Sequence, residues 1–145
     1  MSFPSLESSS LRSFPVSIGY DVDNVGIIDN SQHTIYLVKL WFKNIGSERV
    51  AFIVANLVVI DESGKVYRPI YKYCLASPSC LGLKGSNIKF GCPLSPIELY
   101  PKENNTVVYV FESLPHKGEI YFEIYDINDI GLTKKLEAVK LNLVI

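Results

Sequence analysis

Three cysteines are the residues with the clearest capacity for chemistry in this sequence. Cys74, Cys80 and Cys92 follow the spacing C-x5-C-x11-C and contain no CxxC pair. In an oxidising compartment, two such thiols can form a disulfide. The bridges we expect are Cys74–Cys80, which would close a short loop, or Cys80–Cys92, and the alternative is that the cysteines are free, packed thiols. Because the number of cysteines is odd, at least one thiol stays unpaired within the chain or pairs between chains.

The same cysteines offer little for a metal site or for catalysis. A Cys3His zinc site would need His33 or His116 as its fourth ligand, and both are distant in sequence. A nucleophilic cysteine needs a histidine base beside it, and none follows or precedes the cysteines closely. The chain also lacks a Gly-rich phosphate loop, a GxSxG motif and an HExxH motif. We therefore predict no enzyme, no cofactor and no metal site.

Two acidic pairs near predicted strand ends are the other candidates for metal ligands. Asp21-x-Asp23 and Asp126-x-x-Asp129 could offer carboxylate oxygens to Ca²⁺ between loops. Solvated carboxylates that stabilise turns are the more common explanation of such pairs. The sequence therefore assigns no ligand set for a metal ion.

A basic and aromatic stretch surrounds the first cysteine. Tyr67, Arg68, Tyr71, Lys72 and Tyr73 could stack on nucleic-acid bases. The alternative is contact with another protein, or tyrosines in the core with solvated hydroxyls. We favour the alternative and predict Tyr71 and Tyr73 as protein-contact residues.

One further motif concerns modification. Asn104-Asn105-Thr106 is an N-glycosylation sequon at a predicted turn. Such triplets are common by chance, so the motif mainly indicates that Asn104 is exposed.

The composition sets limits on the function. The chain has 145 residues, which suits one domain, with 14 Lys and Arg against 15 Asp and Glu. A net charge of −1 disfavours a nucleic-acid partner. No run of about 18 apolar residues occurs, and we expect neither a membrane span nor a signal peptide. A single methionine, with lysine in excess of arginine, resembles the composition of proteins from heat-adapted organisms.

Alternating hydrophobicity identifies the structural elements. In 34–43, Tyr36, Val38, Leu40 and Phe42 alternate with the side chains of a second face. Further strands are expected at 16–28, 50–60 (one bent strand or two short ones), 65–68, 106–111, 119–125 and 136–145. These segments predict an all-β, antiparallel, immunoglobulin-like β-sandwich of seven to nine strands. Its core should contain Tyr36, Val38, Leu40, Phe42, Ile120, Phe122, Ile124, Leu141 and Leu143.

Two segments lie outside this pattern of strands. Residues 1–14 form a Ser-rich N-terminal arm, and 15–145 form a single β-sandwich domain. Within the domain, 70–97 is rich in Cys, Pro and Gly and is too long for a simple connection. We expect this loop to pack over one end or one face of the sandwich and to be held by a cysteine bridge.

The second face of the strand at 34–43 is unusually apolar. It carries Ile35, Leu37 and Trp41, which we predict as protein-contact residues. Soluble monomers rarely leave such a patch exposed. We expect either another chain or the N-terminal arm to cover it, and the arm offers Phe3, Leu6, Leu11 and Phe14.

Part of the chain resembles a known family. Within 34–114, a hairpin and a later strand carry matching residues, which are Leu57, Asp61, Gly64, Tyr67, Leu99, Pro101, Val110 and Phe111. This pattern resembles a family of small immunoglobulin-like β-sandwiches of mostly unknown function, usually secreted or lipid-anchored. The resemblance implies the fold and an external location, and it carries no catalytic residue.

These observations lead to a functional hypothesis. The leading expectation is a non-enzymatic protein–protein binding or assembly module, such as a surface-filament or virion component. The alternative is a soluble intracellular regulator or inhibitor that binds a host or cellular protein, and a metal- or ligand-binding domain comes third. The partner is another protein or a second copy of this chain. An extracellular, cell-surface or virion location is favoured over the cytoplasm.

Overall fold

The computed structural model describes residues 14–27 and 33–145, and these contain nine strands and one 3₁₀ helix. The elements are β1 (Val16–Ile27), β2 (His33–Asn44), β3 (Val50–Asp61), β4 (Val66–Tyr67), η2 (Pro78–Leu81), β5 (Ile88–Phe90), β6 (Leu94–Leu99), β7 (Asn104–Phe111), β8 (Lys117–Asp126) and β9 (Lys135–Val144).

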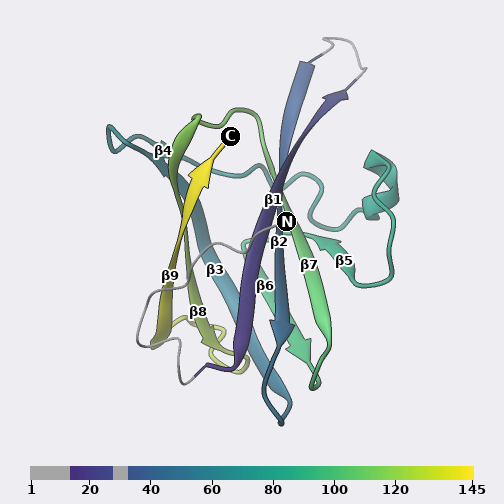
Figure 1. The fold of residues 1–145 in the computed structure, drawn as a ribbon, viewed down its shortest axis with the longest axis vertical. Coiled ribbons are helices and arrows are strands. Elements are labelled where there is room, and N and C mark those ends of the chain that lie inside the picture. The colour runs from purple at the N-terminus through teal and green to yellow at the C-terminus, as the bar shows by residue number, and fades with distance from the viewer. Residues whose placement is uncertain (1–13, 28–32) are drawn as a thin grey trace.

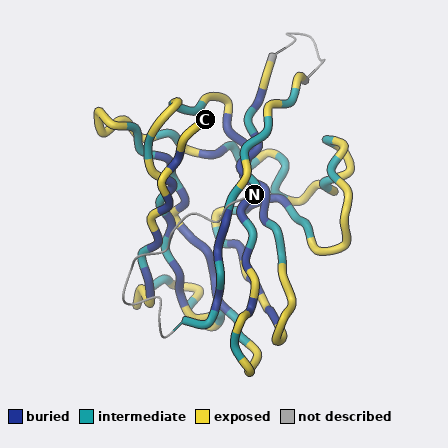
Figure 2. The backbone as a smooth tube through the Cα atoms, viewed as in Figure 1, coloured by how far each residue is buried: buried dark blue, intermediate teal, exposed yellow. Residues whose placement is uncertain are grey.

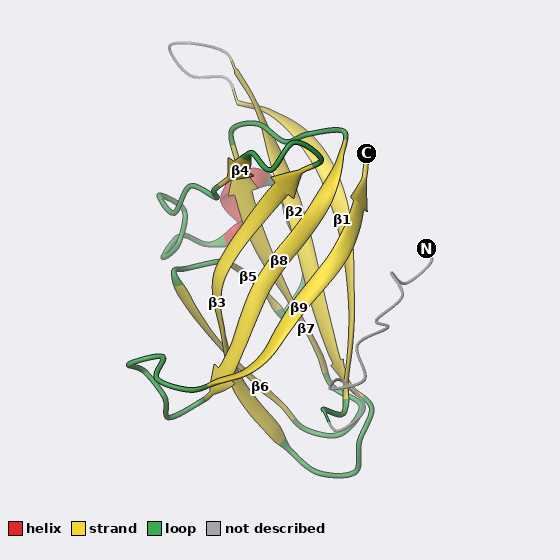
Figure 3. Ribbon diagram, turned by 90° about the vertical axis from the view of Figure 1, so that its left-hand side faces the viewer, coloured by secondary structure: helices red, strands yellow, loops and turns green. Residues whose placement is uncertain are grey.

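The strands form two sheets that pack face to face (Figures 1 and 3). Sheet A has the order β1-β2-β7-β5. Sheet B has the order β4-β3-β8-β9, and β6 pairs with β3 as well. Every pairing is antiparallel except that of β5 with β7. The prediction of an all-β, antiparallel sandwich of seven to nine strands is confirmed.

The hydrophobic core lies between the two sheets, as the alternation predicts. Phe42 from sheet A is at its centre, with ring centroids 5.5 Å from Phe52 and 5.9 Å from Phe122 of sheet B. Buried residues are concentrated in the strands of both sheets (Figure 2). Of the predicted core residues, only Tyr36 is not fully buried, and it packs against the edge of the core. The others that are buried are Val38, Leu40, Ile120, Ile124, Leu141 and Leu143.

The long apolar segment at 50–60 is one bent strand. A bulge shifts the register between β3 and β8 from Ala55 to Val58, and Asn56 adopts a left-handed backbone with φ of 56°. Asn is among the residues that tolerate this conformation best. The turn predicted after this strand is also present, because Asp61 Oδ1 accepts hydrogen bonds from the backbone N–H groups of Ser63 and Lys65 at 2.9 Å.

The segment at 70–97 is more ordered than a simple loop, which corrects its predicted extent. It contains η2 and β5, and β6 begins at Leu94. Short apolar stretches could not be recognised as strands on their own, but here β7 and β3 give them partners. Pro96 is tolerated because β6 is an edge strand. We refer to residues 70–92 as the flap.

The flap packs over the outer face of sheet A, as we predicted for the long loop. Ile35 and Leu37 are fully buried beneath it, in a second cluster with Phe90, Val108 and Val110. The expectation that another chain covers these two residues is therefore wrong, and the part expected of the N-terminal arm lies outside the described residues. Ile35 and Leu37 have no exposed surface to offer a partner. Trp41 is covered differently, because its ring lies against Gly19 of β1, where a Cβ atom would come within 1.9 Å of it.

The predicted N-terminal arm, 1–14, lies outside the described residues except for Phe14. The ring of Phe14 packs edge-on against Phe52, with centroids 5.1 Å apart. Docking by Phe3, Leu6 and Leu11 therefore stays a prediction. Within the described part of the chain, no helix has the length and hydropathy needed to cross a membrane.

Candidate functional site

The disulfide joins Cys74 to Cys92, with Cα atoms 4.9 Å apart. Both pairings expected from the sequence, Cys74–Cys80 and Cys80–Cys92, are therefore wrong. The flap leaves the sandwich after Ile70 and returns through β5 along β7, which brings the two ends of the flap together. Cys80 lies in η2, where it is exposed and free. The prediction that a cysteine bridge holds this segment is confirmed.

The inner side of the flap is anchored to the sandwich. The backbone N–H of Ile70 donates a hydrogen bond to Val110 O at 2.7 Å. The ring of Tyr73 packs on Phe90, with centroids 5.5 Å apart. Leu81, Leu83 and Ile88 also pack against the buried cluster on sheet A. Tyr73, predicted as a protein contact, is thus largely a support for the flap.

A buried hydrogen-bond network connects the disulfide to the main core. Tyr109 Oη donates to Ser95 Oγ at 3.2 Å, and Ser95 Oγ donates to Cys92 O at 3.1 Å. The N–H of Cys92 in turn donates to Ser95 Oγ at 3.0 Å. Burial raises the pKa of Tyr109, so its hydroxyl stays a neutral donor. The base of the flap is therefore fixed both covalently and by satisfied polar groups.

The outer side of the flap presents one apolar side chain. Leu75 is 97% exposed and directly follows the bridged Cys74. Two consecutive turns hold the backbone around it, with Cys74 N–H donating to Tyr71 O at 3.0 Å and Ala76 N–H to Tyr73 O at 2.9 Å. The flap extends beyond the sandwich, with much of its tip exposed (Figures 1 and 2). Leu75 is thus displayed on a fixed backbone.

The flap lies within a segment whose charged residues are all basic. Residues 63–97 contain five basic and no acidic residues, which leaves nine basic and fifteen acidic residues, or a formal charge of −6, for the rest of the chain. Lys65, Arg68, Lys72 and Lys84 are exposed. Lys89 donates to Pro96 O, and partial burial lowers its pKa. The net charge of the whole chain hides this local excess, which a count by segment would have found.

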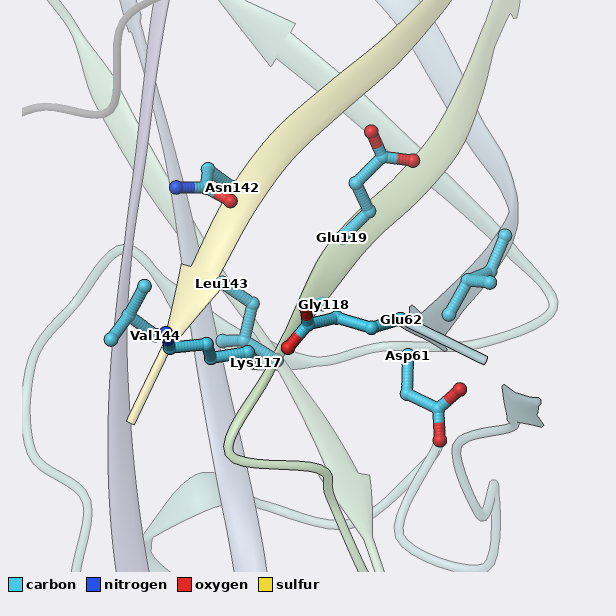
Figure 4. Close-up of a pocket in the computed structure, with 9 residues that line it drawn as sticks. Asp61, Glu62, Lys117, Gly118, Glu119, Asn142, Leu143 and Val144 are labelled. Carbon is cyan, nitrogen blue, oxygen red and sulfur yellow. The ribbon is translucent and has the colours of Figure 1, made fainter. Parts of the chain in front are cut away.

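A cavity of about 440 Å³ lies where β3 and β9 end and β8 begins (Figure 4). Its acidic side chains, Asp61, Glu62 and Glu119, point in different directions (Figure 4). The carboxylate of Asp61 already accepts hydrogen bonds within its turn. The hydrogen bond from Ser63 Oγ and those from the backbone lower its pKa. The described residues contain no group of three acidic, His or Cys side chains that could hold a metal ion. This cavity is therefore a weak candidate for a site.

A polar cluster on the outer face of sheet B has more definite geometry. The carboxylate of Glu123 accepts hydrogen bonds from Tyr121 Oη at 2.6 Å, Asn56 Nδ2 at 2.6 Å and Tyr125 Oη at 2.8 Å. Lys135 Nζ lies 3.8 Å away. The alternation along 119–125 predicts that Tyr121, Glu123 and Tyr125 share the outer face. It does not indicate that Asn56 lies beside them. The bulge in β3 brings that amide to the carboxylate.

The electrostatics of this cluster follow from its donors. Burial acts to raise the pKa of Glu123, but the hydrogen bonds from Tyr121, Asn56 and Tyr125 outweigh it, and the pKa is lowered. Burial, together with the neighbouring Glu123 carboxylate, raises the pKa of Tyr121 to about 12. The carboxylate is therefore ionised and its tyrosine donors are neutral near neutral pH.

Replacing Glu123 with Gln tests this network through its pH dependence. Because the folded-state pKa of Glu123 is lowered, its stabilising effect is present above the ordinary value of 4.5 and is lost as pH falls through the lower folded value. We expect the melting-temperature difference between wild type and Glu123→Gln to be largest near neutral pH and to shrink below pH 4.5 in thermal melts. A difference that does not change with pH would contradict the assignment.

The other predicted residues are placed as follows. Asp23 forms an ion pair with Lys39, and Asp21 accepts a hydrogen bond from the N–H of Val22 at 3.1 Å. Both carboxylates thus contact residues of their own sheet. Asp129 accepts backbone hydrogen bonds from Thr133 and Lys134 at 2.9 Å.

Two further predicted residues remain available for function. Asn104 is exposed at the start of β7, and its glycosylation stays a prediction. Tyr71 is half-buried at the edge of a groove beside Asn56 and Glu123.

The comparisons with known proteins add little to this geometry. No family model and no curated protein matches the chain. A crystal structure of a conserved hypothetical protein from Bacillus anthracis is similar, with a TM-score of 0.42 and 19% sequence identity, over 89% of this chain and 87% of that chain. The sheet order and the Cys74–Cys92 bridge define this protein as a β-sandwich with a disulfide-held flap.

Proposed function

We propose that this protein is a non-enzymatic binding module that docks through the flap onto another protein. The observation that carries the proposal is Leu75, which is 97% exposed on a backbone fixed by the Cys74–Cys92 bridge. Single exposed apolar side chains are common on protein surfaces. What distinguishes Leu75 is its rigid setting, because an anchor that is already ordered loses little conformational entropy on binding.

Charge supports a particular kind of partner. Residues 63–97 contain five basic and no acidic residues, and Lys72 is exposed three residues before Leu75. Its ammonium lies 5.2 Å from the centre of the Tyr73 ring, which holds it beside the anchor. A complementary surface would carry an apolar pocket for Leu75 surrounded by carboxylates. We therefore propose an acidic protein surface as the binding partner.

The disulfide supports a proposed location. Structural disulfides persist in extracellular, cell-surface and virion proteins, and also inside hyperthermophiles. The proposed settings are therefore a surface assembly or virion, as the sequence also favours, with the interior of a thermophile as the alternative.

A site-specific crosslinking experiment tests the proposal. A photoreactive amino acid is placed at position 75 and, as a matched control, at Ile130, which is 71% exposed on the loop between β8 and β9. In extract of the source cells, we expect position 75 to yield one discrete crosslinked protein and position 130 to yield none. High salt should reduce the product, because the partner is acidic. Equal products at both positions would overturn the proposal.

Competition then measures the contribution of the anchor. Excess unlabelled wild-type protein should abolish the crosslink, whereas Leu75→Ser should compete at least about tenfold less well, as expected for a central apolar anchor. If Leu75→Ser competed as well as the wild-type protein, Leu75 would not be part of the interface. A crosslinked product with the mass of two chains would show that the partner is a second copy of this protein and not a different protein.

A further inference from the structure

A groove lies on the outer face of sheet B, and its lining includes no residue from the tip of the flap. It has a volume of about 460 Å³, within the roughly 300–1,000 Å³ typical of small-molecule sites. The bulge of β3, the strand β8 and the chain after β4 meet here. The residues that line it are Asn56, Leu57, Val58, Arg68, Pro69, Tyr71, Pro93 and Glu123.

The polar side of the groove has unused hydrogen-bonding capacity. Glu123 Oε1 already accepts two hydrogen bonds, whereas Oε2 accepts one from the described residues, that of Tyr121, and has Lys135 Nζ 3.8 Å away, which leaves it one acceptor position. The amide of Asn56 donates to Glu123, and its oxygen accepts nothing from the described residues. These two acceptors are fixed relative to each other by their own hydrogen bond. They suit a ligand that presents neighbouring hydroxyl groups.

The opposite side of the groove supplies a free cation. Arg68 is exposed, and among the described residues its guanidinium forms no ion pair. A guanidinium binds a carboxylate through two parallel hydrogen bonds. Glu123, by contrast, already has Lys135 at 3.8 Å to balance its charge. The groove therefore has a net preference for an anionic group at the Arg68 side.

The remaining walls are flat and apolar. Pro69, Pro93 and the half-buried ring of Tyr71 line the groove together with Leu57 and Val58. Such surfaces pack against the C–H face of a saturated ring while polar groups bind its rim. The left-handed backbone of Asn56, with φ of 56°, is a local irregularity of the kind that concentrates at binding sites.

We propose that this groove binds an acidic sugar, a uronic acid or a residue of its polymer. The carboxylate binds Arg68, two ring hydroxyls bind Glu123 Oε2 and the amide oxygen of Asn56, and the ring packs on Tyr71 and the exposed Pro93. This site requires both charge signs and an apolar wall in one groove, and the structure supplies them from β3, β8 and the segments that follow β4 and precede β6.

Titration of ¹⁵N-labelled protein tests the proposal, with glucuronate and galacturonate as probes and glucose, galactose and acetate as comparisons. Backbone amide shifts should saturate at Asn56, Arg68, Tyr71 and Glu123, and the uronates should bind about tenfold or more tightly than the neutral sugars. Acetate should not saturate these shifts, because it lacks hydroxyls. Equal binding of neutral sugars, saturation by acetate, or no saturable shift with either uronate would each overturn the proposal.

Two variants separate recognition from folding. Arg68→Met should reduce uronate affinity about tenfold or more. Arg49→Met, at an exposed arginine that pairs with Glu98 on another part of sheet B, should leave the affinity unchanged. Asn56→Gly keeps the left-handed backbone accessible while removing the amide, and it should weaken both uronates and neutral sugars. Unchanged binding in Arg68→Met and Asn56→Gly would overturn the proposal, whether or not the flap binds its partner.

Discussion

Replacing both Cys74 and Cys92 with serine is expected to lower the free energy of unfolding by about 3 kcal/mol. The bridge spans 18 residues, and closing a loop of about 15 residues removes chain entropy worth about 3 kcal/mol from the unfolded state. For chains near this size, each kcal/mol shifts the melting temperature by about 2–4 °C. Calorimetry should therefore show a melting temperature lower by about 6–12 °C than that of wild type.

The free cysteine provides the matched control. Cys80 is exposed and unbridged, so Cys80→Ser should melt within about 1–2 °C of wild type. Adding reductant should lower the melting temperature of wild type and of Cys80→Ser but not that of the double variant. If Cys80→Ser were as destabilised as the double variant, the bridge would involve Cys80, as the sequence spacing had suggested.

The same variant has a local consequence at the outer face of sheet A. Without the bridge, the flap loses the covalent closure that holds it over Ile35, Leu37 and Val108. Opening of the flap alone would expose these side chains while the main core stays packed. The backbone amides of Ile70 and Gly91, which donate to Val110 O and Val108 O of β7, should then exchange faster with solvent than those of β8.

The sandwich could be predicted because the patterns that mark its strands and turns lie within short stretches of the sequence. In β2, β8 and β9, side chains alternate between a buried and an outer face, and the two-residue period appears directly in the sequence. The turn at Asp61–Gly64 is equally local, since its hydrogen bonds join residues at most four apart. A correct strand pattern together with turn chemistry was enough to indicate the class of fold.

The features that a local pattern could not give depend on distant partners. The short strand β5 exists because β7 pairs with it in parallel, and the choice of Cys92 for Cys74 follows from that return path. The cover over Ile35 also comes from the flap, which begins 35 positions later in the chain. Spacing along the sequence therefore misled the prediction of both the bridge and the cover.

The groove on sheet B shows the same limit at a candidate site. Asn56 and Glu123 are 67 positions apart, and their contact depends on a bulge that the sequence marks only by one polar residue in an apolar strand. The interruption at Asn56 was visible, but its partner was not. Bulges of this kind re-aim a side chain, which explains why alternation alone did not identify the site.

Replacing Phe122 with alanine is expected to cost about 3–5 kcal/mol of unfolding free energy. Phe122 is fully buried, and its ring lies 5.9 Å from that of Phe42, at the contact between the two sheets. Removing the ring leaves a cavity that neither sheet can fill without breaking its own strand pairing. The loss is a large part of the roughly 5–15 kcal/mol available to a domain of this kind, and denaturant unfolding measures it directly.

Glu119→Ala on the same strand is the control for this prediction. Glu119 is exposed on the outer face, so its removal should change stability by no more than about 0.5 kcal/mol. The contrast tests the register of β8, because a shift of one residue would exchange the two faces. If both variants lost the same stability, Phe122 would not point into the core. The pairing of β8 with β3, on which the position of Glu123 beside Asn56 depends, would then be wrong as well.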